Sequence, residues 1–137
     1  MEAVVTHASG TFEVKLNPEW TDEKAEGVPL GRMSIDKQFH GDLQAVSTGQ
    51  MLTAMSSVKG SAGYVAIERV IGTLQDRHGT FALQHTGVMT RGTPELTINV
   101  IPDSGTGQLT GLAGAMDITV ADGKHSYNFH YTLGEKP

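Results

Sequence analysis

The chain has 137 residues and contains no cysteine. Disulfide bonds, thiol nucleophiles and zinc–thiolate sites are therefore excluded. It also lacks a basic N-terminal stretch followed by a long apolar run, and no other segment is apolar for the length of a membrane span. The net charge of −5 includes no basic stripe, which argues against binding to nucleic acid. These absences predict a cytoplasmic protein whose partners include neither a membrane nor nucleic acid.

Metal-binding and phosphate-binding patterns are missing as well. No two of the six histidines stand two residues apart on one predicted strand, the spacing that a metal site on a sheet favours. Residues 104–111 are rich in glycine, but a phosphate-binding loop needs a helix after it, and the pattern predicts none there. We therefore expect no metal and no other cofactor.

Long helical patterns are absent too, and a different repeating unit takes their place. It is a short run of alternating apolar and polar residues that ends at one of the 17 glycines or at another turn residue. The clearest copies are 116–120 and 125–131, on either side of Asp122-Gly123. Strict alternation indicates a strand with one buried face, and Asp-Gly between two such runs indicates a hairpin.

The repeating unit predicts an all-β fold. A single domain, residues 1–137, is expected to form a closed eight-stranded antiparallel meander barrel, which pairs every strand edge and has room for one ligand. Two irregular stretches, 17–27 and 102–108, are expected to be loops that cover a barrel mouth. The predicted strands are 10–16, 31–40, 43–55, 61–74, 79–89, 95–101, 115–121 and 124–133.

The turns between these strands predict their register, and the register predicts which side chains share a face. The expected pairs are Ile118 with Tyr127, Met116 with Phe129, Gln75 with Thr80, and Phe39 with Leu43. The face that these pairs place inside the barrel is apolar except for a few side chains. These are Lys37, Ser47, Glu68 and His85, with the tyrosines Tyr64, Tyr127 and Tyr131.

Charged groups on an inner face point to one of two roles. Burial of an isolated charge costs several kcal/mol, so these groups are expected to pair with one another or to change protonation. A carboxylate and an imidazole in an apolar pocket also suit acid–base chemistry, because burial moves their pKa values toward neutrality. The opposite face of residues 65–71 is itself quite apolar, so an inverted assignment would leave Glu68 and His85 in solvent.

Several segments of the chain resemble a family of small bacterial proteins classed as a domain of unknown function. The segments are LGRMSIDKQFHGDL (30–43), GSAGYVA (60–66), LQHTG (83–87) and SGTG (104–107). The resemblance implies a barrel similar to that of the allene oxide cyclases. It also makes a homo-oligomer possible, since some barrels of this type associate as trimers. It implies a fold and not an activity.

The leading interpretation is a protein of unassigned function that binds a small, largely apolar molecule inside the barrel. Lys37, Ser47, Tyr64, Glu68, His85, Tyr127 and Tyr131 are the candidate ligand-binding residues, and Met51, Phe81, Leu83 and Phe129 the candidate walls. A second hypothesis is an acid–base isomerase or cyclase that uses Glu68 or His85. A third is a structural or protein-interaction module with a filled barrel, whose outer strip would be Val65, Ile67 and Ile71.

Overall fold

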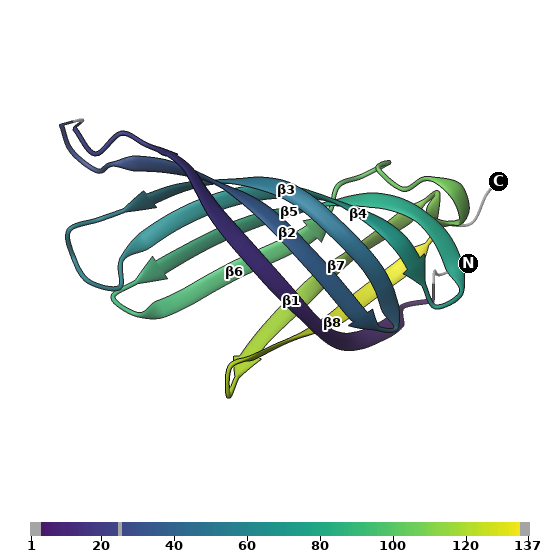
Figure 1. Cartoon of the computed structure of the whole chain (residues 1–137). Coiled ribbons are helices and arrows are strands. Elements are labelled where there is room, and N and C mark those ends of the chain that lie inside the picture. Colours follow the sequence, from purple (N-terminus) through teal and green to yellow (C-terminus); the bar gives the residue numbers. More distant parts are fainter. Residues whose placement is uncertain (1–3, 25, 135–137) are drawn as a thin grey trace.

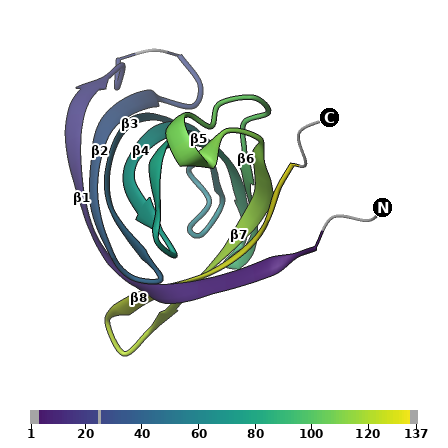
Figure 2. The same cartoon turned by 90° about the vertical axis from the view of Figure 1, so that its right-hand side faces the viewer.

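The computed structural model describes residues 4–24 and 26–134, and its eight strands form one closed antiparallel barrel in sequence order (Figures 1 and 2). The predicted all-β meander barrel is confirmed. The strands are β1 (Thr6–Thr21), β2 (Leu30–Gly41), β3 (Leu43–Met55), β4 (Ala62–Leu74), β5 (Arg77–Thr90), β6 (Thr93–Val100), β7 (Leu112–Ala121) and β8 (Lys124–Leu133). A short 3-10 helix, η1 (Gly107–Leu109), precedes β7. Within the described ranges, no helix is long and apolar enough to cross a membrane.

The inner and outer faces of β4 follow the predicted alternation. Val65, Ile67 and Ile71 are about half exposed on the outer face, whereas Glu68 is fully buried. His85 on the neighbouring β5 is buried as well. The inverted assignment, in which both of these side chains would face solvent, is therefore excluded.

The β4–β5 hairpin has a different turn from the predicted one. Thr80 lies opposite Ile71 and not opposite Gln75. The turn itself consists of Gln75 and Asp76, whose φ angles of 43° and 71° are both positive, as a type I′ turn requires. The register shifts by an even number of residues, so every side chain of the hairpin keeps its predicted face.

The β2–β3 hairpin shows a smaller shift, and the β7–β8 hairpin shows none. Phe39 lies opposite Ala45 and not opposite Leu43, again an even shift that preserves the faces. Ile118 lies opposite Tyr127, as the Asp-Gly turn predicts. Sequence patterning therefore placed the inner face correctly in each hairpin, but it placed two of the three turns incorrectly.

Strand β1 is much longer than predicted. The predicted loop over 17–27 begins only at Asp22, because pairing with β2 continues as far as Thr21. A β-bulge between Pro18 and Trp20 interrupts the register and accommodates the proline, which cannot donate a ladder hydrogen bond. The extra length makes β1 and β2 a long ribbon that projects beyond the barrel (Figure 1).

The β6–β7 loop lies across one end of the barrel, here called the closed end (Figure 2). The first residues of β5 have no partner on β6, whose pairing with β5 begins at Leu83, and the loop forms hydrogen bonds with them instead. The Thr106 N–H donates to Thr80 O at 2.8 Å. The Ala82 N–H donates to Ser104 Oγ at 3.0 Å, so side chains also satisfy the free edge of β5. Leu109 in η1 is buried and joins the core, as expected for a loop that covers a mouth.

A packed core fills the closed end. The rings of Phe81 and Phe129 stack with centroids 5.8 Å apart, and Phe39 meets Tyr127 edge-on at 5.7 Å. The opposite end, which carries the β3–β4 and β5–β6 turns, is here called the open end. Inward-facing residues there, such as Met51, are only partly buried. The barrel is therefore filled over one part of its length and hollow over the rest.

The β7–β8 hairpin separates from its neighbours toward the open end. Strands β6 and β7 share the registered pair Asn99 and Ala115 and no other among the described residues. Pairing of β1 with β8 stops at Phe12 and His125, although β1 runs on to Thr21. The tip of the hairpin accordingly lies apart from the other loops of the open end (Figure 1). The wall therefore has two weakly paired edges, here called seams: the edge between β6 and β7, and the edge between β1 and β8 toward the open end.

Candidate functional site

Four polar side chains meet inside the barrel where the packed core ends. They come from the neighbouring strands β2, β3, β4 and β5. Glu68 is at the centre: its Oε2 lies 2.8 Å from Lys37 Nζ and 2.6 Å from His85 Nε2. Its Oε1 accepts a hydrogen bond from Ser47 Oγ at 2.8 Å. The structure thus brings together Lys37, Ser47, Glu68 and His85, all predicted from sequence, and we call them the polar cluster.

Glu68 is ionised in this arrangement. Burial favours the neutral acid, but the hydrogen bond from His85 and the charge of Lys37 outweigh burial and hold the pKa of Glu68 at about 2. An ionised carboxylate can only accept hydrogen bonds, so the hydrogen between Glu68 and His85 belongs to His85 Nε2. The carboxylate therefore determines the tautomer and the orientation of the imidazole ring.

His85 uses only one of its ring nitrogens in the polar cluster. Among the described residues, no fully buried side-chain nitrogen or oxygen lacks a hydrogen-bond partner. Nδ1 of His85 has no such partner, so it must reach open space, and His85 lines a cavity of about 180 Å³. This inner cavity is bounded by Phe12, Val14, Leu16, Ile35, Lys37, Met51, Tyr64, His85, Leu96, Ile118 and His125. Glu68 is behind this lining and is not part of it.

Lys37 is held between aromatic rings as well as by its ion pair. Its Nζ lies 5.1 Å from the ring centroid of Phe12 and 5.7 Å from that of Phe39, close enough for cation–π attraction. The strand opposite Glu68 carries Gly49, where an added Cβ would come within 2.8 Å of the Glu68 Cβ. Glycine at this position lets β3 approach β4 closely, next to the carboxylate.

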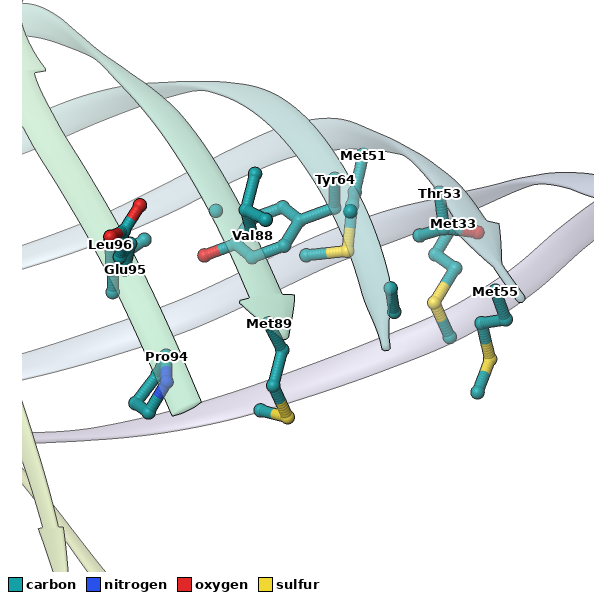
Figure 3. Close-up of a pocket in the computed structure, with 13 residues that line it drawn as sticks. Met33, Met51, Thr53, Met55, Tyr64, Val88, Met89, Pro94, Glu95 and Leu96 are labelled. Atoms are coloured by element: carbon teal, nitrogen blue, oxygen red, sulfur yellow. The ribbon is translucent and has the colours of Figure 1, made fainter. Parts of the chain in front are cut away.

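A second cavity, of about 360 Å³, opens at the end of the barrel and is lined almost entirely by apolar side chains. Four methionines dominate it: Met33, Met51, Met55 and Met89. Figure 3 shows them on β2, β3 and β5 with Tyr64 between the strands. Flexible thioether side chains adapt to different shapes, which suits a binding surface. We call this space the methionine cavity.

Tyr64 lies where the two cavities meet. Met51, Tyr64 and Leu96 line both of them. The Tyr64 ring centroid is 6.5 Å from that of His85. Burial, together with the negative charge of Glu68, raises the pKa of Tyr64, so its hydroxyl remains protonated at neutral pH. Opposite the ring is Gly87, where an added Cβ would come within 2.3 Å of the tyrosine Cε1.

The other two predicted tyrosines lie away from the polar cluster, at the closed end. The Tyr127 hydroxyl donates to His40 O at 2.8 Å and accepts from the Leu43 N–H at 2.9 Å. The Tyr131 hydroxyl donates to Gln75 Oε1. Tyr127 therefore connects the β2–β3 turn to β8, and Tyr131 connects the β4–β5 turn to β8. Neither tyrosine lines the inner cavity or the methionine cavity.

Of the four predicted wall residues, Met51 lines both the inner cavity and the methionine cavity, and the other three line neither of these two. Phe81, Leu83 and Phe129 are buried in the packed core. Sequence reasoning missed Met33, Met55 and Met89, and a signal for them was present. Like Met51, each occupies an inward position in the alternation of its strand, near the end of the barrel that carries the β3–β4 and β5–β6 turns.

No metal centre forms among the described residues. No three histidine, aspartate or glutamate side chains there are grouped closely enough to hold an ion. On the outer surface, His7 Nδ1 lies 2.8 Å from His130 Nδ1, and His130 Nε2 lies 3.1 Å from Asp117 Oδ2. These contacts link the paired strands β1, β8 and β7 on the outer surface, and none of the three residues lines either cavity.

Fold and site together define a class of protein: an eight-stranded antiparallel barrel, packed at one end and hollow at the other, with a buried ion-paired cluster between. The chain belongs to the DUF3224 family of proteins of unknown function, which matches residues 8–131. A crystal structure of a DUF3224 protein of unknown function from Shewanella oneidensis MR-1 is similar to it. The two are 50% identical with a TM-score of 0.90, over 96% of this chain and 100% of that chain. Comparison with curated proteins finds no match.

Proposed function

We propose that this protein binds a small, largely apolar molecule in the open end of its barrel. The observation that carries the proposal is the methionine cavity of about 360 Å³, which lies within the range of small-molecule sites. Such sites are mostly apolar with a few placed polar groups, and here the polar groups are Tyr64, His85 and Lys37 on the adjoining inner cavity. We also propose that the barrel is similar to that of the allene oxide cyclases and that the ligand binds inside it.

An uncharged fluorescent probe, N-phenyl-1-naphthylamine, tests this proposal. We expect its emission to rise and saturate as protein is added, because the dye would leave water for the methionine cavity. Met51→Trp should abolish the increase by filling the space that both cavities share. An unchanged titration in this variant would contradict binding inside the barrel.

Leu52→Trp is the matched control. Leu52 follows Met51 on β3 but faces outward and is 54% exposed. It lines a groove on the outer face that also includes Trp20 and Val65, neither of which lines the methionine cavity. If the probe binds inside the barrel, its fluorescence titration should be the same in this variant as in the unsubstituted protein. Loss of binding in Leu52→Trp, with Met51→Trp unaffected, would place the probe on the outer surface and refute the proposal.

An acid–base isomerase or cyclase is a second candidate, and the geometry of His85 favours it. One nitrogen of the ring is held by Glu68 and the other faces an apolar cavity, an arrangement that suits proton transfer. His85, and not Glu68, would then exchange the proton. Deuterium exchange at the α-carbons of 2-decanone in D₂O, followed by NMR, tests for this activity. Exchange that depends on protein and is lost in His85→Gln would support it, and exchange at the buffer rate would oppose it.

An interaction module is the third candidate, supported by the apolar outer strip of β4. Val65, Ile67 and Ile71 are 50%, 54% and 44% exposed, and contiguous apolar surface often marks a contact between proteins. A homo-oligomer would cover this strip. Sedimentation of the protein and of Ile67→Lys tests the point: a larger species converted to a monomer by the substitution supports it, and a monomer in both cases opposes it.

A further inference from the structure

The inner cavity offers a ligand hydrogen-bond donors and no carboxylate or amide. Its polar lining consists of Lys37, Tyr64, His85 and His125. Lys37 Nζ carries three hydrogens, of which Glu68 takes one, and the Tyr64 hydroxyl has no partner among the described residues. Glu68 is the carboxylate of the cluster, but it is fully buried and already accepts hydrogen bonds from Lys37, Ser47 and His85. A hydrogen-bond acceptor that enters this cavity therefore meets donors from Lys37 and Tyr64, whereas Nδ1 of neutral His85 presents a lone pair and becomes a third donor only when it is protonated.

The charge of the polar cluster sets a second condition. Lys37 and Glu68 cancel each other, so the cluster is neutral when His85 is neutral. An anion in the cavity would add a negative charge in apolar surroundings, which is costly unless it is compensated. His85 can supply the compensation by taking a proton on Nδ1, because Nε2 keeps its bond to Glu68 in both protonation states.

We infer that the molecule bound in the barrel is an amphiphile with an anionic oxygen head, a carboxylate or a group of similar chemistry, and that His85 takes up a proton when it binds. The head occupies the inner cavity, where Lys37 Nζ, Tyr64 Oη and protonated His85 Nδ1 donate to it. The apolar tail fills the methionine cavity, which shares the lining residues Met51, Tyr64 and Leu96 with the inner cavity. This inference rests on the proposed function and adds the class of ligand.

The surroundings of His85 agree with proton uptake at this residue. From β4, Glu68 faces it as an anion and Tyr64 as a neutral phenol. From β2, Lys37 faces it, with its charge already paired. From β6, Ile98 lies opposite in the register and brings no charge. His125 on β8 is the remaining titratable group of the cavity lining, and it contacts Phe12 with ring centroids 5.1 Å apart.

Calorimetric titration of the whole protein with decanoate tests the inference, and 1-decanol serves as the uncharged counterpart. A tail of about ten carbons suits the size of the methionine cavity. Titrations at pH 8 in phosphate and in Tris, whose ionisation enthalpies differ, measure the protons taken up. We expect decanoate to bind at least about tenfold more tightly than 1-decanol, with uptake of about one proton per ligand. Equal affinities, or decanoate binding without proton uptake, would overturn the inference.

Substitutions locate the proton. His85→Gln retains a donor toward Glu68 but cannot be protonated. In this variant, decanoate should bind without proton uptake and no more tightly than 1-decanol. His125→Gln is the control from the same cavity and should retain both. If uptake vanishes in His125→Gln and persists in His85→Gln, the assignment to His85 is wrong. The uptake measured on the unsubstituted protein stands even if His85→Gln fails to fold.

The dye experiment separates this inference from the proposed function. If N-phenyl-1-naphthylamine binds inside the barrel and decanoate does not compete with it, the barrel binds apolar molecules, but the inference that its ligand has an anionic head group is wrong. If neither ligand binds, the proposed function fails and the inference fails with it.

Discussion

Glu68 is the residue on which the interior depends, because it balances one buried cation and orients one buried imidazole. Removal of one partner from a buried ion pair is far more costly than replacement of both by apolar groups. We expect Glu68→Gln to lower the free energy of unfolding by about 3–5 kcal/mol, since it leaves the Lys37 charge without a counter-ion. Urea denaturation followed by circular dichroism measures this loss.

Glu13→Gln is the control for that prediction. Glu13 lies 2.6 Å from His40 on the exposed face of β1. The loss from breaking this pair should stay below about 1 kcal/mol, because solvent screens exposed ion pairs. Similar losses in the two variants would show that burial of the polar cluster does not matter for stability.

The pH dependence of stability follows from the same residue. The pKa of Glu68 is about 2 in the folded protein and has an ordinary value of 4.5. A carboxylate with a lowered pKa stabilises the fold above its unfolded pKa, and the contribution disappears as the pH falls through the folded pKa. Between about pH 5 and pH 2, Glu68 should account for a loss of about 3 kcal/mol.

Unfolding of the protein and of Glu68→Gln across this pH range checks the assignment. The variant lacks the titrating group, so its stability should fall less steeply with acid than that of the unsubstituted protein. Parallel curves for the two proteins would assign the acid sensitivity to other carboxylates.

The alternation of residues predicted the face of a side chain but not its depth along the barrel. Glu68, His85, Tyr127 and Tyr131 all point inward, as predicted from sequence. Depth depends on where each turn falls and on how strongly the strands tilt, and two of the expected turns were misplaced. For this reason the polar cluster could be predicted, whereas the tyrosines of the closed end could not be told apart from Tyr64.

At the scale of the element, the hairpin turns show which local signals decide the register. Asp122-Gly123 was recognised in the sequence because Asp-Gly is a common type I′ pair. Gln75-Asp76 adopts the same positive φ angles with residues that rarely signal such a turn, so its position was missed. A tertiary contact helps to offset the cost of these positive φ angles, because Gln75 accepts a hydrogen bond from the Tyr131 hydroxyl.

The β5–β6 turn allows this explanation to be tested. Arg91 has a φ of 45° and precedes Gly92, with a φ of 91°. Arg91→Asn would create Asn-Gly, the favoured pair for a type I′ turn. We expect it to raise the free energy of unfolding by about 1 kcal/mol, measured by urea denaturation. A destabilised variant would show that the arginine makes contacts that outweigh its backbone strain.

The seams beside the β7–β8 hairpin are a second feature at this scale. Backbone groups of β7 that face β6 are unpaired beyond Ala115, whereas those that face β8 are paired as far as Ala121. Local opening is easiest where few hydrogen bonds must break. We expect β7 amides facing β6 to exchange with deuterium much faster than amides between β3 and β4, as measured by NMR. Equal protection would show that the barrel is closed along its whole length.

At the scale of the whole molecule, the barrel is divided into a packed part and a hollow part, with the polar cluster between them. Eight strands enclose a space that side chains can fill, and whether they do so depends on residue size at each depth. Large rings fill the closed end, whereas methionines, alanine and glycine line the open end. The closed barrel could be predicted from strand number, but the hollow could not, because it depends on three-dimensional packing.

Methionine methyl groups provide the most direct test of the central claim that the hollow end binds a small molecule. A ¹³C-methyl spectrum of the labelled protein reports on Met33, Met51, Met55 and Met89 in the cavity, and on Met116 in the packed core. On titration with N-phenyl-1-naphthylamine, we expect saturable shifts of the four cavity signals, caused by the aromatic rings of the probe, and no shift of Met116. An unchanged spectrum, or shifts that do not favour the cavity methionines over Met116, would contradict binding in the open end of the barrel.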